Sequence, residues 1–295
     1  MWTDFSPLTV QRDGVTLFAR QGGPSDSGRP PLLLLHGHPQ TMAMWHRVAP
    51  VLAKERRVVL MDLRGYGDSD RPPAGEGSAA YAKREMAKDA VALMQSLGHE
   101  RFALLAHDRG ARVAHRLALD HPQAVTRLML LDIAPTLAMY EGTTEAFARG
   151  YWHWFFLIQP APRPERLIEA DPVAYLREGM GSKGDFFDKR AWVEYERCLL
   201  RPGSAAAVCA DYRAGAGIDL DHDRADRAAG RRVSQPLRVL WGAQGIVGTC
   251  FEPLALWRAA ADNVTGRAVD SGHYIAEEAP ELVLTEAQAF FNEDE

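Results

Sequence analysis

Residues 106–111 read AHDRGA and place an aspartate between a strand-like run and a helix-like run. The apolar run ends at Asp108, and small residues stand on either side of it, at Ala106 and Gly110. A tight strand-to-helix turn crowds the backbone, so this pattern is typical of a turn that presents a nucleophile. The alternative is a helix N-cap, which is a common position for aspartate.

A carboxylate in this position suits displacement at a saturated carbon. A serine that attacked such a carbon would leave an ether, which water does not cleave, whereas a carboxylate leaves an ester. A water molecule activated by a histidine can hydrolyse the ester and return the carboxylate. Asp108 therefore predicts alkyl transfer from carbon rather than acyl transfer.

Two arginines follow the aspartate at the start of the helix-like run. Arg109 and Arg112 are three residues apart, so they share roughly one face of a helix near its positive end. Such a site favours a carboxylate, and bidentate arginine contacts would orient a substrate acid with its α-carbon towards Asp108. The alternative is pairing with surface carboxylates, which contributes little to stability.

The elements that must position these residues are visible as apolar runs. A hairpin is predicted around Asp13-Gly14. Five short, continuously apolar runs follow, and they are typical of strands buried on both faces of a parallel sheet. They cover 30–37, 56–63, 101–108, 125–133 and 236–243. Helix-like stretches between them predict an α/β fold with a mostly parallel central sheet flanked by helices.

This alternation stops between residues 136 and 233. The segment is rich in aromatic residues and proline around 151–165 and then turns helical. We predict a helical cap inserted after the sixth strand, over the carboxyl ends of the strands, where open α/β sheets bind their ligands. The predicted domains are a core of 1–135 and 234–295 and a cap of 136–233.

Charge and cysteine content narrow the possible partners. A net charge of -5 argues against a nucleic-acid partner. Cys198, Cys209 and Cys250 are widely spaced and form neither a disulfide framework nor a metal motif. There is no signal-peptide pattern, and no apolar run approaches the length of a membrane span. We expect a cytoplasmic protein without membrane partner, metal or organic cofactor.

Further motifs follow one another in a recognisable order. HGHP lies at 36–39 after the third strand-like run, RGYGDSD at 64–70 follows the next run, and DSGHY at 270–274 supplies a histidine. With these motifs the sequence resembles the α/β-hydrolase superfamily, and within it most closely the fluoroacetate dehalogenases. The closer resemblance is carried by HDRGAR (107–112), LALDHP (117–122), LDIAPT (131–136), YWHWFF (151–156), QPAPRPE (159–165) and CADYRAGAGIDLDHDRAD (209–226).

The resemblance implies a catalytic base, His273, and an acid that holds its tautomer. In the superfamily this acid follows the sixth or the seventh strand. The loop after the seventh strand, 242–251, contains no carboxylate, whereas the sixth strand ends at Asp132, so we assign Asp132. The alternatives are a turn role for Asp132 and a structural role for His273.

The resemblance also implies three sets of binding groups. They are Arg109 and Arg112 for the substrate carboxylate, His153, Trp154 and Tyr212 as donors to the halide, and the backbone N–H groups of His38 and Arg109 for the oxyanion. Aromatic residues of a cap more often pack as core, which is the alternative for Trp154 and Tyr212. The chain departs from the family pattern at His38, where phenylalanine is usual, and at Ala111, where a second glycine is usual. Because His38 contributes its backbone, the first departure bears mainly on pocket shape.

Three functions compete at this point. The first is hydrolytic dehalogenation of a small anionic substrate, which converts fluoroacetate to glycolate. For this function the resemblance also implies a homodimer. The second is turnover of chloroacetate, another haloacid or an epoxide by the same nucleophile, with Tyr151, Tyr175 or Tyr212 available to protonate an epoxide oxygen. The third is a binding protein that has kept the fold, and an intact set of nucleophile, acid and base argues against it.

Overall fold

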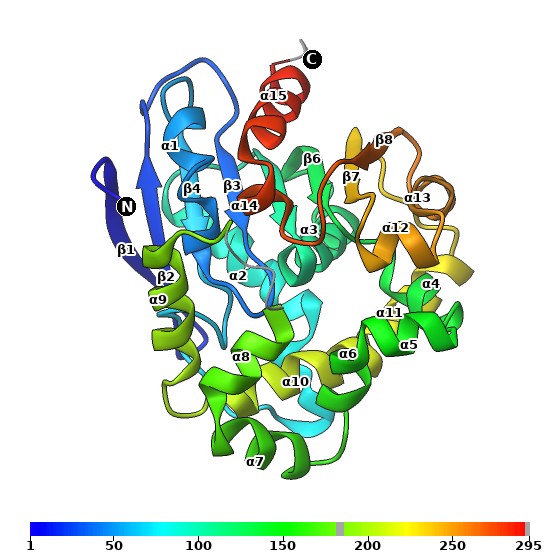
Figure 1. The fold of residues 1–295 in the computed structure, drawn as a ribbon. Coiled ribbons are helices and arrows are strands. Elements are labelled where there is room, and N and C mark those ends of the chain that lie inside the picture. Colours follow the sequence, from blue (N-terminus) through cyan, green and yellow to red (C-terminus); the bar gives the residue numbers. More distant parts are fainter. Residues whose placement is uncertain (181–185, 293–295) are drawn as a thin grey trace.

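A single mixed sheet organises the protein, whose computed structural model describes residues 1–180 and 186–292 (Figure 1). The strand order is β1-β2-β4-β3-β5-β6-β7-β8. The strands are β1 Phe5–Arg12, β2 Val15–Gly22, β3 Leu32–Leu35, β4 Val58–Met61, β5 Phe102–His107, β6 Val125–Leu131, β7 Leu237–Gly242 and β8 Val264–Val269. The β1-β2 and β2-β4 pairs are antiparallel, and the other pairs are parallel. The predicted mostly parallel α/β sheet is therefore confirmed.

The predicted hairpin joins β1 to β2. Asp13 has a φ of 50° and Gly14 a φ of 78°, and the strands pair from Arg12 with Val15 outwards. A two-residue turn with both central residues at positive φ matches the twist of antiparallel strands, and Asp-Gly is a preferred sequence for it.

The five predicted buried strands are also present, as β3 to β7. Every residue of β3 and β4 is buried, and successive side chains join different cores. Leu33 packs in the core that includes Met86 of α2, whereas Leu32 packs in the core that includes Val283 of α15. The sheet is thus covered by helices on both faces, as parallel sheets usually are. We did not predict the edge strand β8, because half of its residues are exposed and its apolar pattern is weak.

Helices make up the rest of the regular structure. Those of the sheet layers are η1 Met42–Trp45, α1 Ala49–Leu52, η2 Glu76–Tyr81, α2 Lys83–Ser96, α3 Asp108–Asp120, α12 Ile246–Cys250, α13 Pro253–Ala260, α14 Ile275–Glu278 and α15 Pro280–Phe291. Those between β6 and β7 are α4 Thr136–Glu141, α5 Glu145–Gly150, α6 Trp152–Leu157, α7 Arg163–Ala170, α8 Pro172–Met180, α9 Lys189–Leu199, α10 Ser204–Ala216 and α11 Ile218–Ala228. Figure 1 shows α6, α7, α8 and α10 gathered below the strands. We keep 136–233 as the proposed extent of the cap.

Across 1–180 and 186–292, no helix is both long enough and apolar enough to cross a membrane. The longest one, α2, has 14 residues, and most of its exposed face is polar.

Candidate active site

Asp108 lies at the sharp turn between β5 and α3. Its φ is 43°, a left-handed conformation that costs a non-glycine residue free energy and is often found at functional sites. The turn presses against the loop after β3, where a Cβ on Gly37 would lie 2.5 Å from the Asp108 Cβ. The Gly110 amide donates to the His36 carbonyl at 2.9 Å, and a Cβ on Gly110 would collide with that carbonyl. Glycine is therefore sterically required at Gly110, and also at Gly37 in the loop that faces the aspartate.

The Asp108 carboxylate is buried yet stabilised as an anion. The backbone N–H of His38 donates to its Oδ2 at 3.0 Å. Burial alone would raise the pKa of Asp108, but the neighbouring His273 and the guanidinium groups of Arg109 and Arg112 hold that pKa below its usual range. The side chain is thus an ionised carboxylate close to neutral pH, as a nucleophile must be.

His273 and Asp132 form the predicted base and acid pair. Nδ1 of His273 donates to Oδ2 of Asp132 at 2.6 Å, and the Gly242 amide donates to Oδ1 at 2.9 Å. Burial opposes the charged imidazolium, yet the bond to Asp132 outweighs it and raises the pKa of His273 above its ordinary value. Because Nδ1 carries the proton, Nε2 is the nitrogen that can accept one.

Two further residues fix the position of the histidine. The Tyr151 hydroxyl lies 3.2 Å from Nδ1 of His273. The buried His107 donates from Nε2 to the His273 carbonyl at 2.9 Å. Sequence reasoning missed both contacts, since neither residue type nor spacing indicates a partner that lies more than a hundred positions away.

The Arg109 side chain is largely committed to another residue. Its Nε and Nη2 donate to the two carboxylate oxygens of Asp211 at 2.8 and 2.9 Å, and its guanidinium lies 4.2 Å from the centre of the Tyr212 ring. Across the described residues, Nη1 is the one nitrogen of this guanidinium with no hydrogen bond. A bidentate clamp by Arg109 on a substrate, as we predicted, does not fit this arrangement, because Asp211 occupies two of the three nitrogens. The Arg109 backbone N–H is in the first turn of α3, where helices leave amides unpaired, and stays a predicted oxyanion donor.

Arg112 is held differently, without a carboxylate. Its Nη1 donates to Thr136 Oγ1 at 2.8 Å and to the Ala134 carbonyl at 3.2 Å, and its guanidinium lies 4.6 Å from the Trp154 ring. Its Nε is buried and has no partner in the part of the chain that is described. The groups that remain for a substrate carboxylate are therefore Nη1 of Arg109 and Nε of Arg112.

The three predicted halide donors lie close together on α6 and α10. The Tyr212 ring centre is 5.9 Å from that of His153 and 6.5 Å from that of Trp154. The Trp154 Nε1 and the Tyr212 hydroxyl are buried and have no partner among residues 1–180 and 186–292. Burial lowers the pKa of His153 to about 3 and raises that of Tyr212, so both side chains are neutral. The site can therefore offer neutral N–H and O–H donors to an anion.

Asp211 is the main residue that sequence reasoning missed. Besides Arg109, it binds the Lys83 ammonium and accepts a hydrogen bond from the Tyr66 hydroxyl at 2.7 Å. It is fully buried on α10, directly before Tyr212, in the otherwise apolar stretch SAAAVCADY. A charged residue on the apolar side of a helix was the available signal, because such a charge needs a buried partner.

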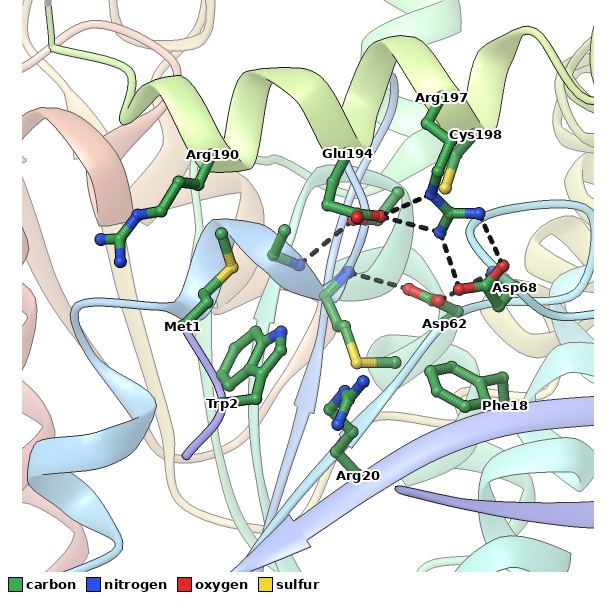
Figure 2. Close-up of a pocket in the computed structure, with 13 residues that line it drawn as sticks. Met1, Trp2, Phe18, Arg20, Asp62, Asp68, Arg190, Glu194, Arg197 and Cys198 are labelled. Carbon is green, nitrogen blue, oxygen red and sulfur yellow. Dashed lines mark hydrogen bonds and ion pairs between the residues drawn. The ribbon is translucent and has the colours of Figure 1, made fainter. Parts of the chain in front are cut away.

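A small hollow of about 20 Å³ is lined by His38 and Tyr66. Two larger hollows on the surface lie away from the residues described above. Figure 2 shows one of about 260 Å³ beside Met1, Trp2 and Phe18, in which Arg197 pairs with Glu194 and Asp68. A groove of about 650 Å³ runs past His115, Leu119, Leu137 and Leu256. Neither contains a nucleophile with a base beside it. No group of three metal-ligating side chains was found in the described ranges.

Comparison with known proteins gives a consistent result. The family model described as the alpha/beta hydrolase fold matches residues 30–280. A fluoroacetate dehalogenase from Burkholderia sp is 43% identical over 95% of this chain and 92% of its own, and a soluble epoxide hydrolase from Corynebacterium sp. (strain C12) is 33% identical over 88% and 90%. A solved α/β-hydrolase structure from Nostoc sp PCC 7120 superposes with a TM-score of 0.95, at 47% identity over the whole of both chains.

Replacing Asp211 tests the buried ion cluster. Asp211→Asn leaves the Arg109 and Lys83 charges buried without a carboxylate between them, so the free energy of unfolding should fall by about 3–5 kcal/mol. The control is Asp68→Asn, which removes a half-exposed partner of Arg197 and should cost less than about 1 kcal/mol. Urea denaturation of both variants measures the free energy of unfolding. Equal decreases in the two variants would show that the buried cluster contributes no more to stability than a surface ion pair.

Proposed function

Because the chain belongs to the α/β-hydrolase fold family, we propose that it hydrolyses the carbon–halogen bond of short 2-haloacids and converts fluoroacetate to glycolate and fluoride. The nucleophile in this proposal is Asp108, the base is His273, and Asp132 holds the base. The relatives named above support the hydrolase class, and the groups around Asp108 support the substrate.

The observation that carries the proposal is the state of Arg112. Arg112 is 3% exposed, and its guanidinium makes no ion pair within the described chain. A buried cation without a carboxylate is costly, and burial accordingly lowers the pKa of Arg112. A substrate carboxylate beside Nε would relieve this cost and bring the neighbouring carbon to Asp108, one helical turn away.

The first step is displacement. An oxygen of Asp108 attacks the carbon that carries the halogen, the carbon–halogen bond breaks, and the electron pair leaves with the halide. Trp154, Tyr212 and His153 donate hydrogen bonds to this anion as it forms. Donors that are already oriented in a dry site stabilise developing charge without reorganisation, which matters most for fluoride, a poor leaving group.

The second step returns the carboxylate. Nε2 of His273 takes a proton from water, and the resulting hydroxide attacks the Asp108 ester carbonyl. The His38 amide, which donates to Asp108 Oδ2 at 3.0 Å, is in position to stabilise the tetrahedral oxyanion. Collapse of this intermediate breaks the bond between the Asp108 carboxyl carbon and the ester oxygen. Glycolate leaves with that oxygen, which came from Asp108, and takes a proton from His273, while the oxygen of the water stays in the restored carboxylate.

The second candidate is an epoxide hydrolase, which the Corynebacterium relative supports. Such an enzyme needs tyrosine hydroxyls directed at an epoxide oxygen, and the Tyr212 hydroxyl has no partner in the described structure. The hydroxyl of Tyr151, however, lies against His273, and an epoxide gives Arg112 no counterion. A haloacid therefore accounts for more of the buried groups. A homodimer and a cytoplasmic location stay predictions.

The decisive assay is fluorine NMR. Purified protein should release free fluoride from fluoroacetate, while Asp108→Asn should release none, because an amide oxygen is too weak a nucleophile. Chloroacetate and an epoxide are assayed in parallel. Chloride release without fluoride would restrict the proposal to chloroacids, and turnover of the epoxide alone would replace it with the second candidate.

Loss of the base should trap the ester. His273→Asn keeps the first step but removes the proton acceptor of the second, so one carboxymethyl group should remain on the protein after exposure to fluoroacetate. Intact-mass measurement detects it, and peptide mapping should place it on Asp108. An unmodified mass, from a variant that still releases one equivalent of fluoride, contradicts the assignment of His273.

The pH dependence of ester hydrolysis should report the His273–Asp132 pair. The base must be neutral, and Asp132 raises the pKa of His273, so the rate should increase with pH through a value above 6.5. In Asp132→Asn the inflection should move to lower pH while the maximal rate falls. Single-turnover decay of the ester measures this between about pH 5 and 9, and an unmoved inflection rejects the coupling.

A further inference from the structure

The His38 side chain lies among the groups assigned to the halide. Its backbone amide donates to Asp108, and its ring centre is 5.5 Å from that of Tyr212 and 6.4 Å from that of His153. His38 as a whole is 7% exposed. The backbone of this residue thus contacts the predicted nucleophile, and its ring lies beside two of the predicted halide donors.

The contacts of the imidazole define its tautomer. Nε2 lies 3.4 Å from the Tyr175 hydroxyl, and Nδ1 is buried without a partner in the described ranges. If Nε2 carried the proton, the Tyr175 hydroxyl proton and the Nδ1 lone pair would both lack partners. If Nδ1 carries it, Tyr175 donates to Nε2 and a single group is left unpaired. The second arrangement leaves fewer buried polar groups unsatisfied and is therefore favoured.

Burial also keeps this ring uncharged, since it lowers the pKa of His38 to about 4. The imidazole is thus a neutral donor through Nδ1–H. Its ring lies beside that of Tyr212, which in turn lies beside Trp154, and the Tyr212 hydroxyl and the Trp154 Nε1–H are buried without partners in the described ranges. Three unpaired donors in one small region call for an anion, and a compact anion uses them best.

We propose that His38 is a specificity-determining residue whose Nδ1–H donates a hydrogen bond to the departing halide. The proposal rests on the dehalogenase function above. A phenylalanine in this position would fill the same space and keep the backbone amide but would offer no donor. The added donor should therefore favour fluoride, whose charge is the most concentrated, over chloride.

The test compares two substrates in matched variants. His38→Phe should lower the ratio of kcat/KM for fluoroacetate to that for chloroacetate by about tenfold or more, as expected for a lost hydrogen bond to an anion. Tyr175→Phe removes the hydrogen bond that favours the Nδ1–H tautomer of His38 but keeps the imidazole, so it should lower the ratio less. His99→Phe is the control, because His99 precedes β5 at the end opposite Asp108. An unchanged ratio in a folded His38→Phe protein overturns the proposal.

A second readout does not require turnover. Sodium fluoride and sodium chloride are titrated into wild type and His38→Phe while tryptophan fluorescence is followed, and Kd for fluoride should rise by about tenfold in the variant. If wild type releases neither fluoride from fluoroacetate nor chloride from chloroacetate, the proposed dehalogenase function is wrong. A higher Kd for fluoride in His38→Phe would then still support a hydrogen bond from His38 to the halide. If His38→Phe binds fluoride with the same Kd as wild type, the proposed hydrogen bond from His38 is wrong, whatever the turnover rates are. Circular dichroism confirms that the variants are folded.

Discussion

The buried ion pair between Arg109 and Asp211 is the interaction on which the rest of the site depends. It joins α3 to α10, which lies between β6 and β7 in the chain, so it fixes Tyr212, a predicted halide donor, relative to Asp108, the predicted nucleophile. Tyr212 follows Asp211 directly, and its ring lies against the same guanidinium. Such a pair contributes little net stability after desolvation, but removal of either partner leaves an uncompensated charge. Its value lies in the geometry that it enforces.

This constraint divides the two arginines into different roles. Arg109 is neutralised within the protein and acts mainly as a structural connection with one nitrogen to spare. Arg112 lies on the next turn of α3, where neutral acceptors hold its guanidinium. Its charge is therefore available to pair with an anionic ligand. Two residues that look equivalent in the sequence therefore differ in what they can bind. The difference arises from a partner 102 positions away from Arg109.

The same distinction explains what the sequence could predict. The buried strands β3 to β7 were predictable because burial on both faces leaves continuous apolar runs, and Asp13-Gly14 predicted its hairpin because few residues accept positive φ. The elbow at Asp108 was predictable from its small neighbours. The edge strand β8, the pairing of Arg109 and the tautomer of His38 were not, because each depends on tertiary neighbours rather than on local pattern.

Under the proposed function, the protonation states of the donor groups would favour release as well as formation of the halide. Burial lowers the pKa of His38 and of His153, and it raises that of Tyr212, so every proposed donor is neutral. A cationic donor would bind fluoride more strongly, yet it would also hold the product after the ester has been hydrolysed. In the proposed reaction, neutral donors would stabilise the halide through directed hydrogen bonds. Arg112, which has no ion pair among the described residues, would bind the substrate carboxylate. The proposal thus assigns stabilisation of the leaving group and binding of the substrate to different groups, so that strong binding of the substrate carboxylate need not slow release of the halide.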